Sequence, residues 1–228
     1  MFSKDTYIQR RAELKKLVGN GIIVLFGNNE APYNYPANCY APMRQDSTFL
    51  YYFGQHRDGL VGIIDVDNDE EWLLGDDIDV DDIVWMGFTP SVADLAAEVG
   101  VTKTAPMAKL QTLCGGGNAT HRTVHYLPPY RHDTKILLMD LLGIHPSKQK
   151  EAASEVLIKA VVKMRSAKEP QEIAAIDRAC DIGYEMHTTA QRLIKPGVTE
   201  RFIGGQVDGV APKLSLVMGM RSPSGWGV

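Results

Sequence analysis

The chain has 228 residues, of which 44% are hydrophobic and 23% charged, and its formal net charge at pH 7 is −4. These values are typical of water-soluble globular proteins that bury a core without disulfide bonds. The negative net charge gives no long-range attraction for nucleic acid or for an acidic membrane surface, so both partners are disfavoured. The length suits one domain plus part of a second.

Targeting and membrane signals are not evident. The first residues, MFSKDTYIQRR, lack an apolar signal-peptide core, and no later run reaches the ~20 apolar residues of a membrane span. The cysteines Cys39, Cys114 and Cys180 are too scattered for a disulfide framework or a zinc knuckle. We therefore expect a cytoplasmic protein in a reducing compartment.

The first half of the chain predicts a sheet preceded by a helix. Helical spacing of apolar residues runs over 5–18, and a β-branched apolar run at 22–26 indicates a buried strand. Further short runs rich in aromatic or β-branched residues predict strands at 48–53, 60–65 and 71–74, with turns at 58–59 and 67–69.

The next segment alternates helical and strand patterns. Helical spacing predicts helices at 92–99, 105–113 and 134–142, with candidate strands at 101–102 and 123–126 between them. Together these elements predict an α/β fold in which helices flank a mixed sheet.

Two long helices are predicted after residue 150. The first covers 150–164, and the second begins at a capping box over 166–169 followed by Pro170 and runs to Leu193. Pro196-Gly197 should end it, with Thr199 capping the next helix. We place the domain boundary between about Met164 and Pro170. The second helix carries a stripe that we expect to face a core: Ile173, Ile176, Cys180, Tyr184, His187 and Ile194.

Three patterns that bear on chemistry have ordinary structural explanations. Asp65–Asp69 begins like a calcium loop, but Glu70 occupies the position that needs glycine, which favours a solvated hairpin turn. His121 and His125, with His132 beyond, are spaced for a shared metal, but no carboxylate lies between the first two to act as a base. The glycine-rich stretch after Cys114 lacks phosphate-loop spacing and predicts a flexible loop. No residue stands out as a covalent nucleophile.

Two segments carry a more specific signal. The run Met43-Arg44-Gln45-Asp46-Ser47-Thr48-Phe49-Leu50-Tyr51-Tyr52-Phe53-Gly54 resembles the F-R-Q-D-S-x-F-x-Y-x-x-G signature of the N-terminal domain of the aminopeptidase P family, with Met43 replacing an aromatic residue. The signature positions are Arg44, Gln45, Asp46 and Ser47.

Three shorter matches support this resemblance: Arg10-Arg11, Leu25-Phe26-Gly27-Asn28 and Trp85-Met86-Gly87, the last of which resembles the family's W-x-G. The family often places an arginine after that motif, and residues 88–90 of this chain do not supply one. The resemblance makes Trp85 a candidate contact with a neighbouring subunit's substrate site; an ordinary buried aromatic is the alternative.

The second segment runs from Met164-Arg165 to Thr199-Glu200 and is similar to the R-x-x-K-x-x-x-E-I … P-G-x-T-E pattern that opens the pita-bread domain of aminopeptidase P, prolidase and creatinase. The resemblance implies a creatinase-like N-terminal domain at 1–165 and the start of a pita-bread domain at 166–209. Residues 210–228 form an atypical tail. A truncated or frameshifted reading frame would explain its change of character, and we expect it to be poorly packed.

The resemblance also implies a chemistry. The family's full-length enzymes hold two divalent ions, usually Mn²⁺, through two Asp, one His and two Glu, and a bridging hydroxide attacks the peptide bond before proline. All five ligands lie downstream of the helix that Thr199 begins, yet residues 210–228 contain no Asp, Glu or His. We therefore expect no catalytic residue, metal ligand or bound Mn²⁺ in this chain.

Two functions follow as hypotheses. In the first, the chain is the N-terminal portion of an Xaa-Pro aminopeptidase, which acts on Xaa-Pro peptides when full length, and is inactive alone. In the second, it is a non-catalytic module for protein binding or oligomerisation, with a homo-oligomer as one outcome.

Overall fold

The computed structural model describes residues 2–34, 39, 43–79, 83–84, 87–114 and 122–217, and for 212–217 the backbone alone. The chain divides into two compact units, Met1–Ser166 and Ala167–Val228, and each is described by itself.

The first unit is built on a five-stranded mixed sheet of order β4-β3-β2-β1-β5. The central strands β1, β2 and β3 pair antiparallel, whereas β5 joins β1 and β4 joins β3 in parallel. This arrangement confirms the predicted α/β fold with a mixed sheet. The strand bounds are β1 Ile22–Phe26, β2 Val61–Asp65, β3 Glu70–Leu74, β4 Lys103–Ala105 and β5 Val124–His125.

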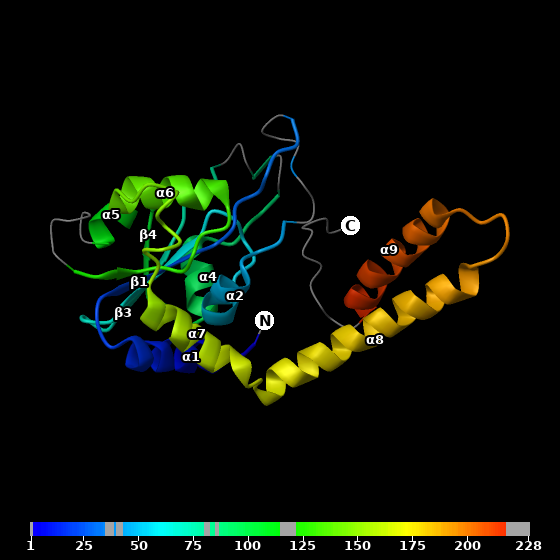
Figure 1. Cartoon of the computed structure of the whole chain (residues 1–228), viewed down its shortest axis with the longest axis horizontal. Helices are drawn as coiled ribbons and strands as arrows, with labels where there is room; N and C mark the ends of the chain where they lie inside the picture. Colours follow the sequence, from blue (N-terminus) through cyan, green and yellow to red (C-terminus); the bar gives the residue numbers. More distant parts are fainter. Residues whose placement is uncertain are drawn as a thin grey trace. The chain divides into compact units, whose positions relative to one another are not determined.

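Helices cover both faces of this sheet, with α6 on one face and α1 and α7 on the other (Figure 1). The strands supply both cores because their side chains alternate. Ile23 and Leu25 of β1 belong to the cluster under α1, α2, α4 and α7, and Ile22 and Val24 to the cluster under α5 and α6. The helix bounds are α1 Lys4–Val18, α2 Ser47–Phe53, α4 Val92–Glu98, the 3₁₀ turn η1 Met107–Lys109, α5 Leu110–Leu113, α6 His132–Leu142 and α7 Glu155–Ser166.

The strand predicted at 48–53 is wrong, because this segment forms helix α2. Its N-terminus is capped by Asp46, and its C-terminus ends at Gly54, which adopts the left-handed conformation (φ +63°). Phe49 and Phe53 lie one turn apart and stack with ring centroids separated by 5.4 Å. Capping and i, i+4 aromatic packing thus outweigh the strand preference of the residue types.

Several other element boundaries also differ from the predictions. The strand predicted at 101–102 is wrong, because the short strand β4 (Lys103–Ala105) begins only after it, and the helix predicted at 105–113 is divided into η1 and α5 after Pro106. Helix α7 begins at Glu155 rather than at 150. The Ser154 hydroxyl accepts a hydrogen bond from the Leu157 amide, as expected of an N-cap.

The second unit contains two described helices, α8 (Pro170–Leu193) and α9 (Glu200–Val217), which form a helical hairpin. The capping box of α8 is formed by Glu169, the N-cap, and Glu172. It therefore lies three residues further along the chain than the box predicted over 166–169. The predicted cap of α9 is confirmed, since Thr199 Oγ1 accepts from the Phe202 amide at 3.3 Å. The backbone of α9 continues to Val217. The prediction that residues 210–228 pack poorly concerns side chains, and most of these lie outside the described residues.

The stripe predicted to face a core on α8 is exposed, and this expectation is wrong for the described chain. Ile173 is 48% exposed, Ile176 47% and Tyr184 65%. Neighbouring positions such as Ile182 and Met186 are the half-buried ones. The helical period was correct, but a helix with apolar residues on two sides does not reveal which side packs.

Candidate functional site

The signature segment, residues 43–54, contacts the chain just after β1, where Gln45 joins the surrounding loops. Its side chain is buried, with Oε1 accepting from the Asn28 amide and Nε2 donating to the Arg57 carbonyl at 2.8 Å. A Cβ at residue 27 would lie 2.7 Å from the Leu60 carbonyl oxygen and 3.2 Å from the Gln45 amide group. Gly27 is therefore required for this close approach of the backbone.

Asp46 uses both of its carboxylate oxygens. Oδ1 accepts from the backbone amides of Thr48 and Phe49, each at 2.8 Å, which caps α2. Oδ2 accepts from the Tyr130 hydroxyl at 3.0 Å, and that hydroxyl also lies 3.2 Å from Asn28 Oδ1. The segment after β1 is thereby joined to the segment after β5.

A cavity of about 500 Å³ lies at this junction. Its wall includes Asn28, Asn29, Arg44, Asp46, Ser47 and Tyr130. Strands β1 and β5 are parallel neighbours, so both enter this region from their carboxyl ends, where ligands commonly bind in α/β proteins. The four signature positions Arg44–Ser47 are thus brought together on one cavity wall.

The two buried arginines of α1 have a structural role. Arg11 is 0% exposed and donates to Glu71 Oε2 at 2.7 Å, to the Tyr52 carbonyl at 2.9 Å and to the Val99 carbonyl at 2.9 Å. Burial lowers the pKa of Arg11, against the opposing effect of Glu71. Arg10 donates to the Tyr51 carbonyl and lies 3.8 Å from the centroid of that residue's ring. Both therefore hold the C-terminal end of α2.

The start of the second signature segment also contacts α2. Arg165 donates to Thr48 Oγ1 at 3.0 Å, and the Tyr51 hydroxyl donates to the Met164 carbonyl at 3.2 Å. Both residues lie within the first compact unit, which ends at Ser166.

The acidic turn after β2 is a hairpin turn between antiparallel strands, as predicted. Its carboxylates are bound by Arg122, which donates to Asp65 Oδ2 at 2.9 Å and to Asp67 Oδ2 at 3.0 Å. Burial raises the pKa of Asp65, but hydrogen bonds from Arg122 and Asn68 outweigh this effect and hold the pKa below its usual range. A hydrogen bond from the Gly21 amide, followed by those from Arg122, lowers the pKa of Asp67.

His125 has both ring nitrogens engaged. Nε2 lies 3.0 Å from the Asn20 carbonyl oxygen, so it carries the proton, and Nδ1 lies 2.7 Å from the Ser154 hydroxyl. Burial lowers the pKa of His125, against the opposing effects of the Asn20 carbonyl and Asp67. The ring is therefore a neutral structural group, and metal binding would require these hydrogen bonds to break.

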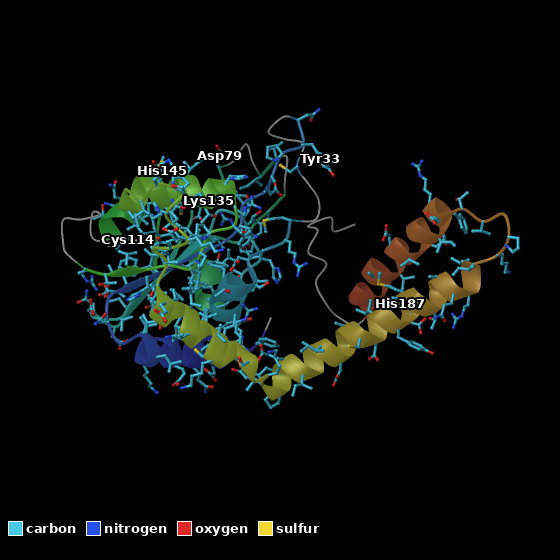
Figure 2. The ribbon with its side chains drawn as sticks, in the orientation of Figure 1. Tyr33, Asp79, Cys114, Lys135, His145 and His187 are labelled. Atoms are coloured by element: carbon cyan, nitrogen blue, oxygen red, sulfur yellow. The ribbon has the colours of Figure 1, made fainter. Side chains whose placement is uncertain are left out.

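The remaining candidate residues do not converge. Cys114 is buried at the end of α5, where burial raises its pKa to about 12, and His187 is an exposed residue of α8 (Figure 2). His132 begins α6. Trp85, His121 and the glycines after Cys114 lie outside the described residues.

No group of three or more His, Cys, Asp or Glu side chains that could hold a metal ion occurs in the described part of the chain. The described residues therefore do not supply the ligand set of a two-metal centre. Within the described ranges, no helix is long and apolar enough to cross a membrane.

Comparison with known proteins identifies the fold and the family. The family described as "Aminopeptidase P, N-terminal domain" matches residues 7–125, just over half of the chain. The chain belongs to this family. A probable Xaa-Pro aminopeptidase of Uncinocarpus reesii is 24% identical over 203 residues, which cover 86% of this chain and 40% of that protein.

Solved aminopeptidase P structures share the fold. The low-pH form of the Escherichia coli enzyme is 22% identical with a TM-score of 0.75, and aminopeptidase PepP of Pseudomonas aeruginosa is 20% identical with a TM-score of 0.77. Each comparison covers 93% of this chain and 50% of the other. The chain thus spans about half the length of the aminopeptidase P structures that it matches.

Sequence reasoning missed the partners that complete the cavity. Tyr130 donates to Asp46 and to Asn28, and Arg131 supplies another part of the wall; of these partners only Asn28 lay in a segment that the resemblance had singled out. Tyr130 follows two prolines in a segment with no helical or strand period. Only the parallel pairing of β1 with β5 places it beside the signature.

Proposed function

We propose that this chain is the N-terminal portion of an Xaa-Pro aminopeptidase, a cytoplasmic enzyme that removes the residue before proline with two Mn²⁺ ions. The observation that carries the proposal is the family match over residues 7–125, which includes the Arg44–Ser47 signature. The name of the Uncinocarpus relative supports the reaction class. In this proposal residues 1–165 form the family domain, 166–209 the start of the catalytic domain and 210–228 an atypical tail.

The same proposal assigns no catalytic step to this chain. The described residues bring together no candidate metal ligands, and the sequence from 210 to 228 holds no Asp, Glu or His. A two-metal hydrolase needs carboxylate and imidazole ligands to generate hydroxide at neutral pH. The chain is therefore inactive on its own.

The direct test is an assay of the purified chain on an Xaa-Pro peptide with added Mn²⁺. Hydrolysis should not exceed the rate of buffer containing Mn²⁺ alone. Escherichia coli aminopeptidase P assayed in parallel shows that the conditions support the reaction. Robust turnover by this chain that a chelator abolishes would show that the proposed inactivity is wrong.

A non-catalytic module for oligomerisation or protein binding is the second candidate. One observation favours it: the apolar stripe of α8 leaves Ile173, Ile176 and Tyr184 about half exposed or more. Exposed apolar patches on soluble proteins often mark contact surfaces. In this candidate Trp85 is a further contact with a neighbouring subunit.

Light scattering with size-exclusion chromatography separates the two candidates. A homo-oligomer that becomes monomeric on Ile176→Glu substitution would favour the module. A strict monomer over micromolar to 0.1 mM concentrations, with or without that substitution, would leave it without support.

A further inference from the structure

The cavity beside the signature has the location and size of a ligand site. It lies at the carboxyl ends of the parallel strands β1 and β5 and encloses about 500 Å³. Small-molecule pockets typically enclose roughly 300 to 1,000 Å³ and use a few polar groups to orient the ligand. Its wall comes from residues 28, 29, 31 and 43–47 on one side and from residues 130–131 on the other, with 84 positions of sequence between Asp46 and Tyr130.

Most polar groups of this wall are already engaged. Asp46 caps α2 and accepts from Tyr130. Arg131 donates to Asp133 at 3.0 Å and to the Asn29 carbonyl at 3.0 Å. The Asn29 side chain accepts from the Gly59 amide and donates to Asp133. These groups build the wall and leave little capacity for a ligand.

Arg44 differs from them. It is exposed and lines the cavity, and its guanidinium has no hydrogen-bond or ion-pair partner in the part of the chain that the structure describes. Ser47, three residues on, also lines the cavity and is exposed. Both oxygens of the neighbouring Asp46 carboxylate accept hydrogen bonds from other groups, and no ion pair joins Asp46 to Arg44 within the described ranges.

We propose that this cavity binds the carboxylate of a small ligand or short peptide through Arg44, with Ser47 as a second donor. A guanidinium presents a planar pair of N–H donors that matches a carboxylate bidentately. The hydrogen bond between Tyr130, which follows β5, and Asn28, which follows β1, holds the two sides of the wall together. This site is independent of the proposed peptidase activity, because it needs no metal ligand and no residue after 131.

The test uses the whole chain and four probes: Gly-Gly-Ala with a free C-terminus, its C-terminal amide, Gly-Asp-Gly amide and inorganic phosphate. Chemical-shift changes in NMR titrations report binding by each. The free tripeptide should bind with a dissociation constant on the order of 1 mM. Its amide should bind at least about tenfold more weakly, because the charged acceptor is lost. Binding of Gly-Asp-Gly amide would place the recognised carboxylate on a side chain, and binding of the free tripeptide alone would place it at a peptide C-terminus.

The variants are Arg44→Gln, Arg44→Lys and the control Arg178→Gln, which removes the same charge from an exposed position on α8. Arg44→Gln should weaken binding of the free tripeptide about tenfold or more, Arg44→Lys less, and Arg178→Gln not measurably. The proposal is wrong if no carboxylate probe binds or if phosphate binds as tightly as the tripeptide. It is also wrong if Arg44→Gln and Arg178→Gln weaken binding equally.

Discussion

The Tyr130 hydroxyl donates a hydrogen bond of 3.0 Å to Asp46 Oδ2, across 84 positions of sequence. This contact joins the segment that follows β1 to the segment that follows β5. The other oxygen of the same carboxylate caps α2. One signature residue therefore fixes both the start of a helix and a wall of the cavity.

Asp46→Ala should destabilise the first unit by about 1–2 kcal/mol, because α2 loses its cap and Tyr130 loses its acceptor. A urea titration monitored by circular dichroism measures the free energy of unfolding. Asp46→Asn is the matched control: it keeps an acceptor for the helix amides and should cost only a few tenths of a kcal/mol. Equal losses in both variants would mean that charge rather than capping matters.

Arg11→Met should destabilise the first unit by about 2–4 kcal/mol, because it leaves two buried backbone carbonyls without a donor and leaves Glu71 paired with Lys15 alone. Lys16→Met provides the comparison. Lys16 is exposed and lies 3.8 Å from Glu13, so its loss should cost less than about 0.5 kcal/mol. A loss below 1 kcal/mol for Arg11→Met in urea unfolding would contradict the assigned role.

Gly54→Ala and Gly143→Ala separate backbone strain from steric clash. Both glycines end a helix in the left-handed conformation, with φ of +63° and +68°. A Cβ at residue 54 would lie 2.4 Å from the Tyr7 ring, whereas at 143 it would meet nothing within 4 Å. We expect Gly143→Ala to cost about 1 kcal/mol and Gly54→Ala at least about 2 kcal/mol in unfolding free energy. Equal costs would show that the Tyr7 ring moves aside freely.

Stability should decrease as the pH is lowered from 7 to 5. Burial lowers the pKa of His125, so the unfolded chain takes up a proton near pH 6.5 while the folded chain does not until the pH is lower. Below about 6.5 the proton therefore favours unfolding, and the stability present at pH 7 is progressively lost. The pKa values of Asp65 and Asp67 are also lowered in the folded chain, but the stability that these two carboxylates contribute is lost only at a pH below this range.

The measurement is urea unfolding of the wild type and of His125→Gln at pH 5, 6 and 7. The variant is less stable at pH 7 but should show a smaller decrease toward pH 5. His145→Gln removes an exposed histidine and should retain the wild-type slope. His56, whose pKa burial also lowers, contributes equally in all three proteins. An unchanged slope in His125→Gln would contradict the prediction.

The sequence by itself determined the fold class, the central strands and the family. Strand β1 at Ile22–Phe26 and helix α8 up to Leu193 lie where the apolar pattern predicts them. These elements are governed by local periodicity and by capping or breaking residues such as Pro170 and Gly197, which act within a few positions of the chain.

Only the tertiary structure decided the rest. Residues 48–53 look like a strand by composition, but a cap at Asp46 and the burial of their aromatic rings make them a helix. The site depends on β5 pairing in parallel with β1, which brings Tyr130 to Asp46. Such contacts join residues many positions apart, and no local pattern encodes them, because they arise only when the sheet is complete.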